Sequence, residues 1–295
     1  MKTLYKLTIA AALMISGATA QAQLNPNGAQ YYNNRYLSNP AFAGSIEGFN
    51  LSGGYRSLFN NIPGAPVSQS LTGDYGFNKV GLGLNLSNES AGLLRQTRVV
   101  ATYAYRINLD SRGSKLNFGL SGGFMSQRLE QSDISGNVND PMIGNYNSRK
   151  TYIDGDFGMA YTSNSLTIQA AIPNMKSFFK RDVIKLADEA TFYSAVSYKF
   201  NFGKGMGAVG LEPLVAFRGV RGFDNIWDAG ALLGVADQQI QFTGLYHSTG
   251  SATMGVGLNF KKKYLISGLY TSQTSDLSGY TNGSFELNLK IAFGK

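Results

Sequence analysis

The sequence predicts an all-β protein, a transmembrane up-and-down antiparallel β-barrel of fourteen strands. Three observations predict it: an export signal at the N-terminus, a regular succession of strands with alternating apolar and polar side chains, and connections that alternate between short and long. No later segment has the roughly 18 uninterrupted apolar residues that a spanning helix needs. A membrane protein without such helices must close its sheet, because open strand edges cannot be hydrogen-bonded in lipid.

The first 22 residues have the features of a secretory signal peptide. Lys2 and Lys6 form a basic start, residues 7–15 an apolar run, and small residues precede cleavage after Ala20 or Ala22. The apolar run is too short for a membrane span, and its flanks fit cleavage. We therefore expect export from the cytoplasm and location in the outer membrane.

Composition narrows the function classes. The formal net charge of +8 falls to +6 when the two lysines of the signal peptide are removed. No basic helix is predicted and an exported protein seldom meets nucleic acid, so we assign the charge to lipid headgroups and the lumen. The chain contains no cysteine, and its stability must therefore come from the sheet rather than from disulfides.

The last strand has the pattern most clearly. From Phe285 to Phe293 every second residue is apolar, and the residues between are Glu, Asn, Lys and Ala. Successive side chains of a strand point to opposite faces, so this segment has one apolar and one polar side. In the ninth strand Pro213 removes a ladder donor and would need a bulge. The fourteen expected strands lie at residues 47–59, 67–76, 80–89, 97–107, 115–127, 151–162, 165–171, 191–200, 207–217, 226–235, 239–247, 251–260, 264–273 and 284–293.

The lengths of the connections predict an orientation. Connections after even-numbered strands are short, whereas those after odd-numbered strands are mostly longer, above all 128–150 and 173–190. Outer-membrane barrels have short periplasmic turns and long external loops, so both termini are predicted to lie in the periplasm. We expect three parts: the signal peptide at 1–22, a polar periplasmic N-terminal arm at 23–45, and the barrel at 46–295.

Aromatic residues gather at the strand ends beside the short turns. Amphipathic rings favour the boundary between membrane and water, so these residues predict a periplasmic girdle. They are Tyr75, Phe77, Tyr103, Tyr105, Tyr198, Phe200, Phe260, Tyr264 and Phe293.

Charged residues of inward parity predict a charge network in the lumen. Asp154 and Asp156 share the inner face of one strand, and paired carboxylates can hold calcium or perform acid–base catalysis. We favour ion pairing, because buried charges need partners and both signs are present. The expected members are Arg56, Arg98, Arg106, Asp154, Asp156, Glu212, Arg218 and Glu286, with Lys199, Asp228 and Lys290 also available.

His247 is the single histidine of the chain. A barrel hydrolase would need it beside a serine or a carboxylate, yet Ser248 follows it directly and so points to the opposite face of the strand. One histidine is also poor support for a metal site. We expect a residue without a chemical role at the end of a strand.

Two stretches are not explained by barrel physics alone. The segment Asn39-Pro40-Ala41-Phe42-Ala43-Gly44 precedes the first strand, and Arg56, Phe59 and a Gly-Ala-Pro run at 64–66 follow. These stretches resemble the opening of the PorP/SprF family of type IX secretion proteins of Bacteroidetes, with Phe59 where many relatives carry Trp. The residues that carry the resemblance are Asn39, Pro40, Gly44, Arg56, Phe59, Gly64 and Pro66. These residues either contact partners or have a structural role: Asn39, Pro40 and Gly44 would shape a turn at the barrel's base, and Arg56 would join the ion pairs of the lumen. We favour the structural role.

The resemblance implies a non-enzymatic barrel with no cofactor and no metal. Members support the export or surface anchoring of large adhesins that carry a type B C-terminal domain, some of them used in gliding motility. Implied partners are the adhesin, periplasmic ring proteins of the secretion system or a peptidoglycan-binding protein, and outer-membrane lipid.

Three functions remain open from the sequence. In the first, the long outer loops grip the adhesin. In the second, the barrel is a passive transporter or channel for small hydrophobic or polar solutes, with the arm folded into the lumen as a plug. The third is a barrel hydrolase that depends on His247.

Overall fold

The computed structural model of the chain describes residues 29–59, 63–130, 151–175, 190–220, 225–272 and 281–293. The predicted signal peptide, most of the connection at 128–150 and most of that at 173–190 lie outside these residues. No helix among the described residues is long and apolar enough to cross a membrane.

The described residues form a single antiparallel sheet in which successive strands are hydrogen-bonded neighbours. β8 and β9 both pair with β10 and are consecutive pieces of one wall position, so fifteen strands fill fourteen positions. The strands are β1 (Gly48–Leu58), β2 (Val67–Phe77), β3 (Val80–Ala91), β4 (Leu94–Asn108), β5 (Lys115–Leu129), β6 (Tyr152–Thr162), β7 (Leu166–Ile172), β8 (Ala190–Tyr198), β9 (Phe200–Phe202), β10 (Val209–Val220), β11 (Ile226–Val235), β12 (Ile240–His247), β13 (Ser251–Phe260), β14 (Tyr264–Thr271) and β15 (Ser284–Ala292).

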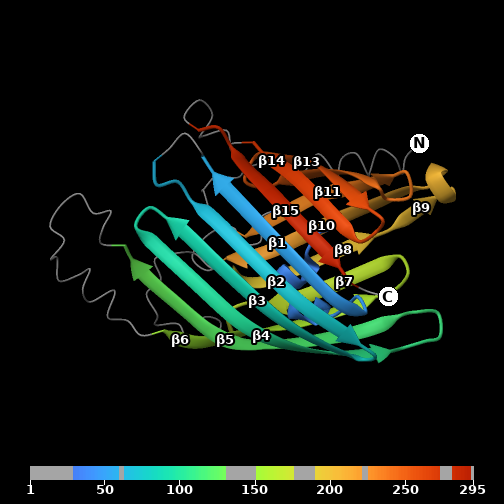
Figure 1. Cartoon of the computed structure of the whole chain (residues 1–295), viewed down its shortest axis with the longest axis horizontal. Helices are drawn as coiled ribbons and strands as arrows, with labels where there is room; N and C mark the ends of the chain where they lie inside the picture. Colours follow the sequence, from blue (N-terminus) through green and yellow to red (C-terminus); the bar gives the residue numbers. More distant parts are fainter. Residues whose placement is uncertain are drawn as a thin grey trace, which may run out of the picture.

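The sheet closes on itself. β1 pairs with β15 from Asn50 opposite Ala292 to Leu58 opposite Ser284, and β10 pairs with β11. Every strand position therefore has two neighbours, and Figure 1 shows the resulting barrel with its strands tilted together. The predicted closed antiparallel β-barrel of fourteen strands is confirmed.

Pro213 lies in β10 and coincides with a break in the neighbouring strand rather than in its own. β10 pairs with β9 up to Leu211 and with β8 from Leu214 onward, so the wall position of β8 and β9 is interrupted opposite Pro213. A proline has no N–H to give to the ladder, which explains the interruption there. The bulge expected within this strand is not at Pro213; the register irregularity lies at Gly219 and Val220.

The two faces of the wall differ as the alternation predicts. In β15, Phe285, Leu287 and Leu289 are 44–63% exposed, whereas the intervening Glu286 and Asn288 are at most 7% exposed. An outer face of exposed apolar side chains around a polar interior suits a barrel whose outer surface meets lipid.

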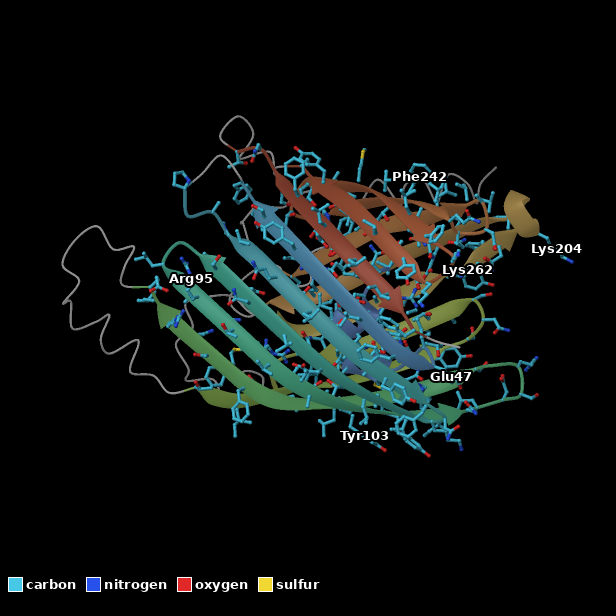
Figure 2. The ribbon with its side chains drawn as sticks, viewed as in Figure 1. Glu47, Arg95, Tyr103, Lys204, Phe242 and Lys262 are labelled. Atoms are coloured by element: carbon cyan, nitrogen blue, oxygen red, sulfur yellow. The ribbon has the colours of Figure 1, made fainter. Side chains whose placement is uncertain are left out.

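The connections after β2, β4, β6, β9, β11 and β13 lie at one end of the barrel and are all short. The other end carries the longest connections, at 130–151, 173–189 and 272–283, together with short ones such as the two residues between β3 and β4. We call these the short-turn end and the long-connection end. In Figure 2, Lys204 and Lys262 lie at the former and Arg95 at the latter. All of the predicted girdle aromatics are exposed, at 38–63%, on strands close to the short-turn end. Neighbouring rings touch there, as Phe49 and Phe293 do with centroids 5.7 Å apart.

Candidate functional site: the lumen and the segment inside it

The predicted arm lies inside the barrel over its described residues. The Ala29 amide donates to Glu286 of β15 (3.0 Å), the Tyr36 hydroxyl to Thr102 of β4 (2.7 Å), and the Gly44 amide to Asp74 of β2 (2.9 Å). Tyr31 also donates to Asp228 of β11, and Asn39 to the carbonyls of Met159 in β6 and Ala170 in β7. These strands lie on different sides of the wall, so residues 29–44 cross the lumen. We call them the luminal segment. It runs from near the long-connection end, where β15 begins, to the short-turn end, where β2 ends.

Local capping shapes the luminal segment. The side chain of Asn34 accepts a hydrogen bond from the Leu37 amide and begins α2 (Arg35–Ser38). Asn39 does the same for the Ala41 amide (3.0 Å) and begins the 3₁₀ turn η1 (Pro40–Phe42). Pro40 stands at the first position of that turn, where its fixed φ fits and its missing N–H costs nothing.

Glycines of the inner wall let the luminal segment approach the sheet closely. A Cβ at Gly119 or Gly158 would collide with Pro40 or Asn39, and a Cβ at Gly81 or Gly76 with the carbonyl groups of Ala43 or Gly44. We call these four glycines of β2, β3, β5 and β6 the glycine seat. Only residues without a side chain allow backbone to pack on backbone in this way, so the seat fixes where residues 39–44 lie.

Polar side chains reinforce the glycine seat. The Asn39 amide nitrogen donates to the Met159 and Ala170 carbonyls (3.2 Å each), and Asn39 is fully buried. Arg106 donates to the carbonyl oxygens of Ala43 (3.1 Å) and Gly44. We expected Arg106 in an ion pair; instead, its guanidinium ties the end of the luminal segment to the wall.

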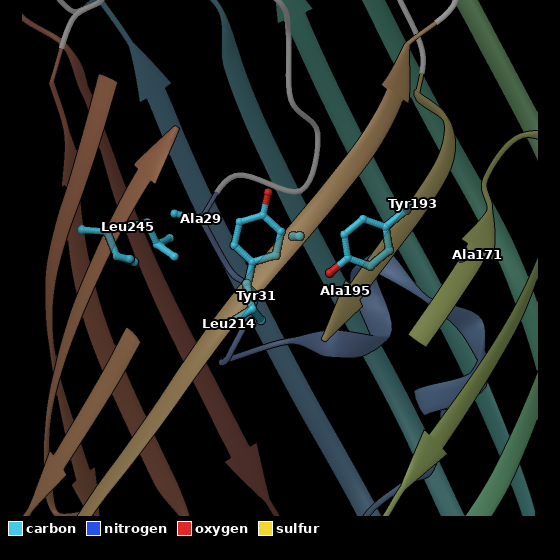
Figure 3. Packing of buried hydrophobic residues seen from close by; sticks show 9 residues of the cluster. Ala29, Tyr31, Ala171, Tyr193, Ala195, Leu214 and Leu245 are labelled. Carbon is cyan, nitrogen blue, oxygen red and sulfur yellow. The ribbon is translucent and has the colours of Figure 1, made fainter. Parts of the chain in front are cut away.

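The other end of the luminal segment packs against a small apolar cluster. Tyr31 is 2% exposed and stacks on Tyr193 of β8 with ring centroids 6.3 Å apart. Leu214 and Leu245 complete its surroundings (Figure 3). The ring of Tyr31 is therefore held between apolar side chains while its hydroxyl points to a polar group.

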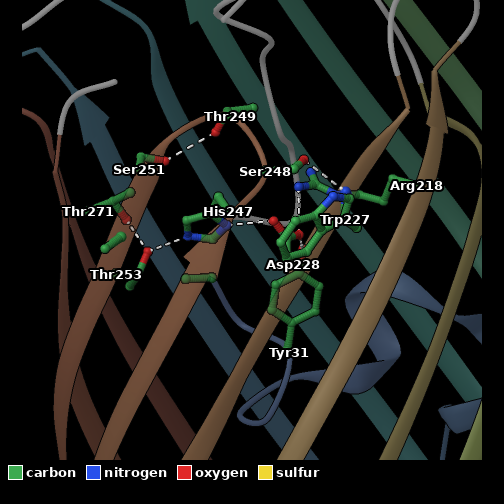
Figure 4. A network of polar contacts seen from close by, with 12 residues as sticks. Tyr31, Arg218, Trp227, Asp228, His247, Ser248, Thr249, Ser251, Thr253 and Thr271 are labelled. Atoms are coloured by element: carbon green, nitrogen blue, oxygen red, sulfur yellow. Dashed lines mark hydrogen bonds and ion pairs between the residues drawn. The ribbon is translucent and has the colours of Figure 1, made fainter. Parts of the chain in front are cut away.

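That polar group is Asp228 of β11, which is fully buried (Figure 4). Its carboxylate accepts hydrogen bonds from Tyr31 and from Arg218 (2.8 Å) and lies 2.6 Å from Nδ1 of His247. Nε2 of His247 lies 2.7 Å from the Thr253 hydroxyl. One carboxylate thus joins the luminal segment to three strands of the wall, and we call this group the Asp228 hub.

His247 therefore has a role that the sequence reasoning missed. Asp228 stands directly opposite His247 in the register of β11 and β12, and Thr253 lies on the inner face of β13. The cross-strand neighbours of His247, rather than Ser248 alone, are the signal in the sequence that points to Asp228 and Thr253. An aspartate, a histidine and a hydroxyl in line resemble a hydrolytic triad. However, Thr253 is 1% exposed and its hydroxyl is also bonded to Thr271 (2.6 Å), so a substrate has no access to it.

Other predicted lumen residues have partners as follows. Arg98 pairs with Asp156 at 2.5 Å, and Arg35 of the luminal segment pairs with Glu212. Lys199 differs from the expectation of a buried ion pair, because it is exposed in the break between β8 and β9. The remaining contacts are Asp154 accepting from the Gly155 amide (2.7 Å), Glu286 accepting from Asn288 (3.0 Å), Lys290 donating to the Asn33 carbonyl (3.2 Å), and Arg56 standing opposite Glu286 in the register. Among the described residues, no group of three His, Asp or Glu side chains could hold a metal ion.

The later family-motif residues lie at the long-connection end, far from the glycine seat. Phe59 has a positive φ of 51° and donates its amide to the Gly283 carbonyl (2.7 Å). Gly64 also has a positive φ, of 75°, and its carbonyl accepts from Gly92 (2.8 Å), while the Pro66 carbonyl accepts from Leu58 (2.9 Å). These residues shape the connection from β1 to β2.

The fold and the lumen define a class: a membrane β-barrel of fourteen strands filled in part by its own N-terminal segment. Comparison with known protein families finds a match over most of the chain. The description "Type IX secretion system membrane protein PorP/SprF" matches residues 20–291. The chain belongs to the PorP/SprF family, as its motifs indicated.

Solved structures with a similar fold are remote in sequence. They include outer membrane protein Omp33 of Acinetobacter baumannii, with 8% identity, coverage of 85% of this chain and 100% of that chain, and a TM-score of 0.48. The toluene transporter TbuX of Ralstonia pickettii has 13% identity, coverage of 93% and 94%, and a TM-score of 0.47. The toluene transporter TodX of P. putida has 11% identity, coverage of 90% and 95%, and a TM-score of 0.46. No curated protein matches the chain.

Proposed function

We propose that this protein is a non-enzymatic outer-membrane barrel of the type IX secretion and gliding apparatus. It supports the export or surface anchoring of a large adhesin that carries a type B C-terminal domain. Membership of the PorP/SprF family supports the secretion role. The observation that carries the docking role is the luminal segment, which is bonded to the wall from Ala29 to Gly44. A barrel occupied in this way offers its rims and loops to a partner, rather than an open lumen.

The orientation follows from the lengths of the connections. The short-turn end, with both chain termini of the barrel, faces the periplasm, because outer-membrane barrels have their long loops outside. The adhesin's C-terminal domain then docks on the long-connection end, where residues 130–151 join β5 to β6 and residues 173–189 join β7 to β8. Periplasmic ring proteins or a peptidoglycan-binding protein dock on the short turns.

A loop replacement tests this proposal. Residues 131–150 are replaced by a Gly/Ser sequence of equal length, and the tagged barrel is purified in mild detergent for mass spectrometry of its partners. We expect the type B adhesin to co-purify with the native chain and to be lost from the variant. The matched control replaces turn residues 110–113 at the opposite end and should keep the adhesin. Equal recovery of the adhesin with the native chain and the loop variant would contradict docking through this loop.

A passive transporter is the second candidate, and the luminal segment also bears on it. Besides the packing of Tyr31, residues 29–38 are held by side-chain hydrogen bonds such as Asn34 to Thr72 (2.9 Å) and Asn33 to Ser267 (2.8 Å). Such a segment could act as a displaceable plug. Conductance in planar bilayers separates the two functions, because a steady current from the purified native barrel supports transport and a closed barrel supports docking.

A further inference from the structure

We propose that the turn between β13 and β14 binds the phosphate group of an anionic phospholipid. The turn consists of three consecutive lysines, Lys261, Lys262 and Lys263, all of them exposed at the short-turn end. Lys262 is committed to Asp237 of the neighbouring turn through an ion pair of 2.7 Å. Lys261 and Lys263 flank it and are the two cations that the proposed site uses.

The backbone holds these lysines in fixed positions. The Lys263 amide donates to the Phe260 carbonyl (3.1 Å), and the Lys263 carbonyl accepts from the Ala292 amide of β15 (2.9 Å). Lys261 and Lys262 have positive φ values of 54° and 55°, which reverse the chain within three residues. A tight turn tied to a third strand therefore fixes the backbone from which the two lysine side chains extend.

Aromatic rings direct the ammonium groups to the outside of the barrel. Lys261 Nζ lies 5.2 Å from the centroid of the Phe260 ring, and Lys263 Nζ lies 5.5 Å from that of Tyr264 and 5.4 Å from that of Phe293. Phe260 and Tyr264 stand opposite each other in the register, so their side chains are neighbours on the outer face. Cations within about 6 Å of a ring centroid are attracted to its face. Both ammonium groups are therefore held on the girdle rather than over the mouth of the barrel.

That position decides between the anionic partners. Phospholipid phosphates lie just beyond the aromatic girdle, around the circumference of a barrel. An acidic protein approaching the mouth would instead meet exposed lysines such as Lys204 in the turn that leads from β9 to β10. Two ammonium groups beside outward-facing rings match a lipid, which offers an anionic phosphate to the cations and acyl chains to Phe260 and Phe293.

The test measures retained lipid by native mass spectrometry of the folded, detergent-purified full chain during titration with phosphatidylglycerol. We expect Lys261→Gln/Lys263→Gln to weaken binding by about 5-fold per lysine, roughly 25-fold in total, as for single cations near an anionic surface. The matched control is Lys115→Gln/Lys204→Gln, which removes the same charge from two other exposed positions. Lys115 begins β5 and Lys204 lies in the turn between β9 and β10, both at the short-turn end. This control should bind as the native chain does. A mobility shift on heating in gel electrophoresis verifies that each variant is folded.

Three results would overturn the proposal. The first is unchanged retention in the Lys261/Lys263 variant, and the second is an equal loss in the control, which would indicate only diffuse charge attraction. The third comes from competition: displacement of the lipid by millimolar inorganic phosphate or by polyglutamate would indicate a site for free anions or acidic chains. Resistance to both competitors, together with loss in the Lys261/Lys263 variant alone, supports a lipid site.

Discussion

Replacing Gly119 by alanine places a methyl group where the luminal segment now rests. The added Cβ would lie well inside 3.4 Å, the lower limit of ordinary van der Waals contact, from the backbone of Pro40 and Ala41. Backbone atoms cannot rotate away as a side chain can, so the wall and the segment must separate. Overpacking of this kind costs about 1–3 kcal/mol. The ladder of β5 with β4 and β6 is untouched, so we expect the cost to fall on the docking of the luminal segment.

The chain supplies a matched control on the same strand. Gly122 of β5 faces outward, and a Cβ there would meet nothing within 4 Å. A loss of about 1–3 kcal/mol shifts the equilibrium between docked and undocked segment by roughly 5- to 150-fold. In planar bilayers we expect Gly119→Ala to increase the open time of the barrel by a factor in this range and Gly122→Ala to behave as the native chain. Identical currents from the two folded variants would refute the idea that the glycine seat holds the segment in the lumen.

Three further changes test other parts of the structure. Asp228→Asn should lower the free energy of unfolding by about 3–5 kcal/mol, since it leaves Arg218 buried without its charged partner; denaturation in detergent measures this, and a loss below 1 kcal/mol would argue against the hub. Tyr36→Phe removes the hydrogen bond to Thr102 and should lower the free energy of unfolding by about 1 kcal/mol in the same assay. An unchanged midpoint of denaturation would contradict this expectation. Hydrogen bonds from the Ser114 and Arg112 amides hold the pKa of Asp110, in the turn from β4 to β5, below its ordinary value of 3.8. The stability that Asp110 contributes is therefore complete above pH 3.8 and is lost as the pH falls through its lower folded-state pKa. Asp110→Asn should then melt at a lower temperature than the native chain at pH 7 but at the same temperature in strong acid. A difference in melting temperature that does not change with pH would contradict this assignment.

The strands could be predicted because their signal is local. Alternation over a few residues, as in Phe285 to Phe293, fixes both the element and the face that each side chain occupies. Short turns then fix which strands are neighbours, and an even number of strands allows closure. The interruption between β8 and β9 was not predicted, because Pro213 of β10 affects the pairing of a neighbouring strand.

The occupied lumen could not be predicted in the same way. Residues 29–44 have no period of two, and their partners are distant in sequence, as for Asn39 and Gln169, whose side chains bond across 130 positions. The inward parity of Gly119 and Gly158 was readable from the strands, but nothing local shows what fills the space that they leave. The Asp228 hub was easier to predict, since His247 and Asp228 are neighbours once β11 and β12 are paired in register.

Hydrogen exchange of the purified barrel tests most directly whether the luminal segment is part of the folded wall. The amides of Ala41, Phe42, Ala43 and Gly44 all donate hydrogen bonds, and these residues are buried. We predict that peptides covering residues 39–44 exchange as slowly as those of β4 and β5. Exchange within seconds in a barrel whose strands remain protected would contradict the account.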